Sequence, residues 1–144
     1  MIELDGFDSL KYDDNLAEQG KVFTYPFGDK EITITARMIG PSNTRFHEKR
    51  SKSAEREANA ERMALPISKE AKDATFLGDI YDTCILAWSG FIVGGKELKL
   101  TRENWIGVMS EPKVGRKIFQ NFLDEVTDAS QFLPVEKEKS AAGN

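Results

Sequence analysis

The sequence is poor in the residues that build disulfides and metal sites, with one cysteine, Cys84, and one histidine, His47. A single cysteine excludes an internal disulfide and a thiolate metal cluster, and a lone histidine is too few for a metal site built from histidines. Such sparing use of cysteine suits a reducing compartment, so we expect the protein to reside in a cytosol.

Long apolar runs are also missing. No stretch approaches the roughly 20 residues needed to cross a bilayer, and no basic segment precedes an apolar one at the N-terminus. We therefore expect neither a membrane partner nor a signal peptide. The net charge of −4 argues against the whole chain acting as a nucleic-acid binder, which would show a basic face. With 40% hydrophobic and 31% charged residues, the 144-residue chain has the composition of one globular domain.

The chain offers little that resembles a catalytic centre. His47 lies in a charged helical segment without a recognisable nucleophile, so we interpret it as an exposed histidine. Cys84 falls within an apolar helical stripe and is expected to be a small buried group. The run Gly94-Gly95-Lys96 lacks the upstream glycine and the following serine or threonine of a phosphate loop, so we interpret it as a turn.

Two carboxylate pairs, Asp79/Asp82 and Asp124/Asp128, have the spacing of helical neighbours. Paired carboxylates can perform acid/base or metal chemistry, but on a solvated helix face they usually do neither. The sequence therefore predicts a protein that is not an enzyme, with no catalytic residues, no metal ligands and no cofactor.

The first segment with the composition of a β-strand begins at Lys21. Residues 22–25 and 31–35 are rich in β-branched and aromatic side chains, and the turn residues at 27–30 between them predict a β-hairpin within 21–39. An isolated hairpin is marginal in water, so this one should pack on the helices or pair with another chain, and the sequence leaves both open. The acidic residues 1–20 are expected to form an acidic N-terminal arm, and the polar residues 134–144 a disordered tail.

Helical patterns dominate the rest of the chain. They predict helices over 43–64, 68–88, 101–109 and 112–133, the first strongly charged and the second and fourth with apolar residues at three-and-four spacing. The charged helix should present a solvated or protein-contacting face, an interpretation favoured over a nucleic-acid site. The expected fold is a single α+β domain at 21–133, mainly α with a small N-terminal β-hairpin, forming a compact helical body.

The order of these features resembles the tail assembly chaperones of long-tailed bacteriophages, over roughly residues 22–133. The residues that carry the resemblance are Asn43, Phe46, Leu65, Pro66, Trp88, Ser89, Gly90, Leu100, Thr101, Glu103, Asn104, Pro112, Asp128, Ala129 and Phe132. They form an Asn-x-x-Phe helix start, a Leu-Pro break, a Trp-Ser-Gly helix end, a Leu-Thr-x-Glu-Asn segment, a proline-initiated helix and a closing Asp-Ala-x-x-Phe.

The resemblance implies a non-enzymatic protein that works in the cytoplasm of the infected host and is absent from the mature virion. Such proteins bind the tape measure protein and recruit tail tube subunits during tail assembly. Self-association is a further candidate interaction, whereas nucleic acid and membrane are not expected as partners. The main alternative is a structural tail or head-completion protein of the virion.

A chaperone for an apolar client needs apolar patches of its own. We assign this role to the loop Phe91, Ile92 and Val93 and to Trp105, which lies in a short helix beside a glycine. Tryptophan is enriched at interface hot spots, which supports the choice of Trp105. Trp88 ends an apolar stripe and is expected to pack inside.

Overall fold

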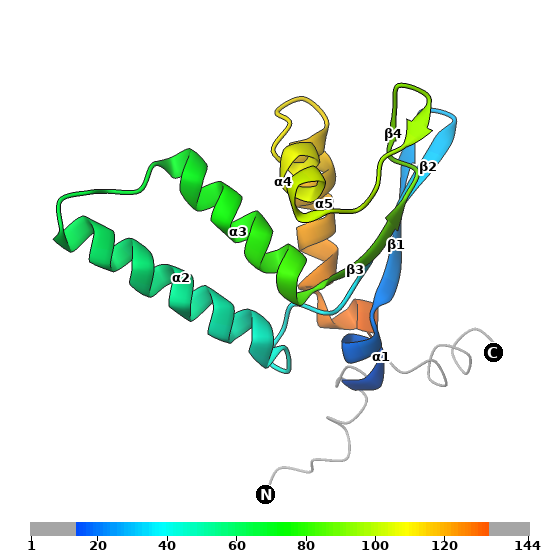
Figure 1. Cartoon of the computed structure of the whole chain (residues 1–144). Helices are drawn as coiled ribbons and strands as arrows, with labels where there is room; N and C mark the ends of the chain where they lie inside the picture. The colour runs from blue at the N-terminus through cyan, green and yellow to red at the C-terminus, as the bar shows by residue number, and fades with distance from the viewer. Residues whose placement is uncertain (1–13, 133–144) are drawn as a thin grey trace, which may run out of the picture.

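The computed structural model of the chain describes residues 14–132 (Figure 1). In chain order the elements are α1 (Asp14–Gln19), β1 (Lys21–Phe27), β2 (Lys30–Ala36), α2 (Thr44–Arg62), α3 (Lys69–Thr83), β3 (Ile85–Ser89), β4 (Ile92–Val93), β5 (Lys96–Glu97), α4 (Arg102–Met109), α5 (Gly115–Val126) and the 3-10 helix η2 (Ala129–Phe132). The predicted α+β class with its N-terminal hairpin is confirmed. The tail predicted at 134–144 lies outside the described residues, as does the part of the predicted acidic N-terminal arm that precedes residue 14.

A three-stranded antiparallel sheet with the order β1-β2-β3 forms one side of the domain. Alternate residues of the hairpin, among them Phe23 and Ile34, point into the core, as the period of two along a strand requires. Phe23 makes edge contacts with Phe122 of α5 and Phe132 of η2, at centroid distances of 5.9 and 6.0 Å. The hairpin thus packs on the helices and pairs with β3 of the same chain.

The helix predicted over 68–88 is wrong at its C-terminal end. Helix α3 stops at Thr83, and Ile85–Ser89 form β3, which pairs with β2 so that Ile34 lies opposite Trp88. Pairing with this segment gives β2 a second neighbour and satisfies the backbone groups on its outer edge. The spacing of Cys84 and Trp88 predicts about one more turn of helix. Pairing with β2 holds this segment in an extended conformation instead.

The helix predicted over 112–133 is also shorter than expected, because α5 begins at Gly115 and ends at Val126. Pro112 lies in the preceding turn, where the Glu111 carboxylate accepts hydrogen bonds from the backbone N–H groups of Lys113, Val114 and Gly115 at 2.8, 2.7 and 3.1 Å. The carboxylate thereby caps the amino end of α5 from outside the helix.

The other predicted helix starts are confirmed by their caps. Asn43 Oδ1 accepts from the Phe46 N–H, and Thr101 Oγ1 accepts from the Asn104 N–H, each at 3.1 Å. Ser68 caps α3 in the same way. Short polar side chains placed just before a helix satisfy amide groups that have no partner within it, which explains why these starts were readable from sequence.

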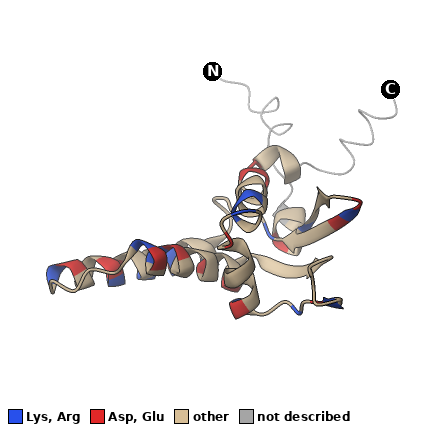
Figure 2. Cartoon of the chain, turned by 90° about the horizontal axis from the view of Figure 1, so that it is seen from above, with Lys and Arg blue, Asp and Glu red and all other residues tan. Residues whose placement is uncertain are grey.

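Helices α4 and α5 pack beside the sheet, while α2 and α3 form an antiparallel helical hairpin, here called the arm, that projects from the body (Figure 1). Basic and acidic residues are interspersed along the arm (Figure 2). Phe46 and Ser53 are the buried residues of α2, so this helix is largely solvated, as its composition indicates.

Candidate functional site

An apolar groove opens where three connections meet: the β1–β2 turn, the β4–β5 hairpin and the turn between α4 and α5. Its volume is about 350 Å³. Its lining is mainly apolar and includes Phe27, Ile32, Phe91, Ile92, Val93 and Val114. A concave surface of this size and chemistry is suited to holding apolar side chains of a partner.

The groove gathers apolar side chains that remain in contact with water. Phe27 is 52% exposed, Ile92 49%, Val93 63% and Val114 38%. Scattered single apolar residues are normal on a protein surface, whereas several converging on one concavity mark an interaction site.

The β4–β5 side of the groove is fixed to the body by aromatic stacking and two hydrogen bonds. Trp88 stacks on Phe91 with a centroid distance of 4.2 Å, and its Nε1 donates to the Leu98 carbonyl at 2.9 Å. The Leu98 N–H donates to the Phe91 carbonyl at 2.6 Å. Gly94 and Gly95 both have positive φ, which a two-residue hairpin turn of this kind requires.

The structure brings three of the four predicted partner-binding residues together. Phe91 is 8% exposed and belongs to the floor, while Ile92 and Val93 stand in solvent at the rim. Their role in binding stays a prediction. Phe27 and Val114 join them, although sequence reasoning had placed Phe27 only in a turn and Val114 only in a helical stripe.

The assignment of Trp105 to the partner surface is wrong for this structure. Its side chain is fully buried, its Nε1 donates to the Leu77 carbonyl at 2.9 Å, and its ring meets Phe122 edge-on at 5.8 Å. Helix α4 is enclosed by α3 and α5 on this side, so the tryptophan fills the core. Met109, four residues later, lies on the same face of α4 and is also buried, so this spacing is the sequence signal for an inward-facing Trp105.

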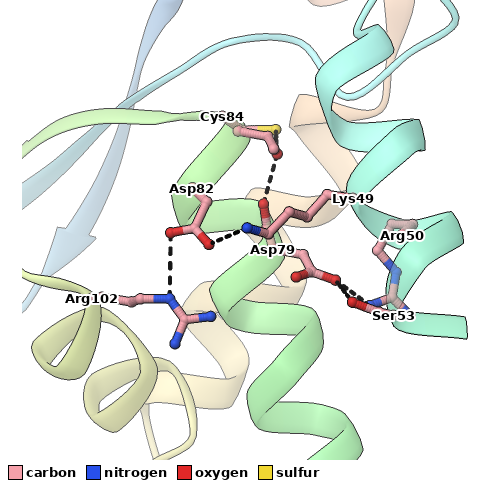
Figure 3. Close-up of polar contacts among 8 residues, drawn as sticks. Lys49, Arg50, Ser53, Asp79, Asp82, Cys84 and Arg102 are labelled. Carbon is pink, nitrogen blue, oxygen red and sulfur yellow. Dashed lines mark hydrogen bonds and ion pairs between the residues drawn. The ribbon is translucent and has the colours of Figure 1, made fainter. Parts of the chain in front are cut away.

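A polar network joins α2, α3 and α4 (Figure 3). Asp79 on α3 is 2% exposed and accepts hydrogen bonds from Arg50 at 2.7 Å and Ser53 at 2.8 Å, both on α2. Asp82, one turn later, bridges Lys49 at 3.2 Å and Arg102 at 3.3 Å. The expectation that both carboxylates are solvated is wrong for Asp79, because the packing of α2 on α3 covers it.

The two side chains with catalytic potential, His47 and Cys84, lie apart from the groove. His47 is exposed and its Nε2 lies 2.9 Å from the Gly40 carbonyl oxygen. Cys84 is buried at the end of α3, and burial raises the pKa of its thiol to about 11. Within residues 14–132, no group of three or more His, Cys, Asp or Glu side chains is placed to hold a metal ion.

Comparison with known proteins yields no match to a protein family, to a curated protein or to a solved structure. Among the helices of residues 14–132, none combines the length and the apolar character that crossing a membrane demands.

Proposed function

We propose that the chain is a tail assembly chaperone of a long-tailed bacteriophage, a non-catalytic protein that binds the tape measure protein and recruits tail tube subunits. The observation that supports this proposal most is the apolar groove with four exposed side chains converging on it. Covering the apolar surface of a long helical client is the central task of such a chaperone, and it needs an accessible apolar surface of this kind.

The charged arm supports the same proposal. Its mixed charges and its solvated faces favour solubility while apolar surface is exposed elsewhere on the molecule (Figure 2). The residue order that resembles the phage chaperones extends over both the arm and the groove, with Trp88 and Ser89 in strand β3 where a helix end was expected, and Pro112 in the turn before α5. We therefore propose that the groove binds the client and that the arm keeps the complex in solution in the host cytoplasm.

The direct test is a pull-down of the tagged chain from cells producing the phage, with partners identified by mass spectrometry. The chaperone proposal predicts recovery of the tape measure protein and the tail tube protein. It also predicts that purified virions lack the chain. Recovery of neither partner, with the chain present in virions, would instead establish a structural tail or head-completion protein.

A further inference from the structure

A second pocket, of about 290 Å³, lies on the arm side of the domain and is separate from the apolar groove. Its floor is made by Ala74 and Thr75 of α3, and Ile106 of α4 and the carboxylate residue Asp79 also line it. Cationic side chains flank it from both sides, Lys49 and Arg56 from α2 and Arg102 from α4. Three lining cations outnumber the single lining carboxylate, so the pocket suits an anionic group.

Arg102 is held in a defined position at this pocket. Its Nε donates to Asp82 Oδ1 at 3.3 Å, which fixes one edge of the guanidinium. A Cβ atom at Gly78 would lie 2.7 Å from Arg102 Cζ and still closer to Nη2, so the glycine makes the room that the guanidinium occupies. The two terminal nitrogens are turned away from Asp82 (Figure 3). Within residues 14–132 they have no carboxylate partner, and the side chain is half exposed, so a carboxylate or phosphate group can reach the guanidinium.

The remaining charges leave this pocket cationic. Asp82 also holds Lys49 Nζ at 3.2 Å, and the buried carboxylate of Asp79 is paired with Arg50. Arg56 forms no ion pair with any residue between 14 and 132. Four cations against two carboxylates give the cluster a net charge of +2, which is enough for one or two carboxylates.

We propose that this pocket binds the carboxylates of an acidic segment of a partner protein, with Arg102 and Arg56 as the contacting residues. A nucleic acid is disfavoured because it needs a continuous basic stripe, whereas Glu48, Glu55 and Glu57 interrupt the basic residues of α2. This inference uses none of the groove residues, so it stands or falls independently of the tail chaperone proposal.

The test is an NMR titration of the full chain at low salt with four probes. They are a blocked tetraglutamate peptide, the matching tetraglutamine peptide, inorganic phosphate and a short single-stranded DNA. We expect tetraglutamate to shift the backbone amides of Ala74, Thr75 and Gly78, and tetraglutamine to leave them in place. Arg56→Gln should weaken tetraglutamate binding about fivefold, the scale of one exposed ion pair. Arg45→Gln, a cation of α2 that is not in the pocket, is the matched control and should bind as the unchanged chain does.

Three results would overturn the proposal: no shift of the floor amides, equal weakening by Arg45→Gln and Arg56→Gln, or tighter binding of phosphate or DNA than of tetraglutamate. The last would reassign the pocket to phosphate groups. Because Arg56 makes no ion pair with a described residue, Arg56→Gln should also leave the melting temperature unchanged, so a binding loss in this variant reports on the pocket and not on folding.

Discussion

Arg50 and Asp79 form an ion pair across the interface of the arm, with Nη1 and Oδ2 2.7 Å apart and the carboxylate almost fully buried. The guanidinium also lies over the ring of Phe76, 5.0 Å from its centroid, and Ser53 donates to the same carboxylate oxygen. A buried carboxylate is tolerated when its charge is paired and its oxygens are hydrogen-bonded. This pair therefore fixes how α2 lies on α3.

Removing the cation should be costly. We expect Arg50→Met to lower the free energy of unfolding by about 3 kcal/mol, because the Asp79 carboxylate stays buried without its counter-charge. Thermal or denaturant unfolding measures the change. Arg56→Met on the same helix is the control and should change the stability by no more than about 0.5 kcal/mol. An equal, small effect of both substitutions would mean that the pair does not hold the arm.

Trp105 should behave as a core residue. Trp105→Ala removes a fully buried ring and its hydrogen bond to Leu77, so we expect a loss of about 4 kcal/mol of stability. Chemical denaturation followed by circular dichroism gives the value. A variant that stays as stable as the parent but binds partners more weakly would return Trp105 to the partner surface.

In contrast to Trp105, the residues at the rim of the groove should contribute to partner binding and little to stability. Val93 is 63% exposed, so Val93→Asp should leave the melting temperature almost unchanged while it places a charge in the apolar groove. We expect recovery of the tape measure protein in a pull-down to fall by at least roughly tenfold, because the loss of one buried valine alone is on that scale and a desolvated carboxylate adds to it.

Met63→Asp is the matched control for that experiment. Met63 is 71% exposed at the far end of the arm and outside the groove, so the same change of chemistry there should leave recovery intact. If Val93→Asp and Met63→Asp lowered recovery equally, the groove would not be the client site.

Glu111 should make the folding stability of the protein depend on pH. Its hydrogen bonds from three backbone N–H groups, led by that of Lys113, hold the pKa of the carboxyl below its ordinary value of 4.5. A depressed pKa in the folded state contributes stability above the unfolded-state pKa, and this contribution is lost as the pH falls through the folded-state pKa. The melting temperature of the parent should therefore exceed that of Glu111→Gln at neutral pH.

The difference should vanish under acid conditions, because a protonated Glu111 resembles glutamine. Melting curves of both proteins over a pH series that crosses 4.5 and continues downward provide the measurement. A difference that stays constant across the series would show that the charge of Glu111 does not cap α5.

Cys84 should be unreactive in the folded protein. Burial raises the pKa of the thiol to about 11, so little thiolate exists at neutral pH and little of it is accessible. We expect a thiol reagent such as Ellman's to react with the denatured chain and to leave the native chain unmodified over the same time. Rapid labelling of the native chain would mean that the base of the arm opens.

The features that could be predicted from sequence depend on neighbours along the chain. The hairpin within 21–39 and the caps at Asn43, Ser68 and Thr101 are of this kind, since turn and cap chemistry acts over a few residues. The missed features depend on distant contacts. Residues 85–89 become a strand because β2 offers an edge, and Asp79 is buried because α2 covers it.

The groove was predicted in part for the same reason. Phe91, Ile92 and Val93 are adjacent in sequence and beside a glycine turn, so their position at one site could be anticipated. Ile92 and Val93 are exposed there, whereas Phe91 is buried in the floor. Phe27 and Val114 reach the groove from elements far away in the chain, and only the packing of the sheet against α4 and α5 brings them together. Trp105 was misassigned because an eight-residue helix is too short for its inward face to be read from periodicity.

The base of the arm has a consequence for the folding pathway. The Asn43 amide donates to Cys84 Sγ at 3.3 Å, and the Arg37 N–H donates to the Cys84 carbonyl at 2.8 Å, so the two ends of the arm are held side by side. The pairing of Ala36 with Ile85 would otherwise close a long loop, whose entropic cost delays non-local strand pairing. A helical hairpin forms from local contacts and delivers β3 to the edge of β2. We therefore expect the arm to form first, because it shortens the loop that the pairing of β2 with β3 must close.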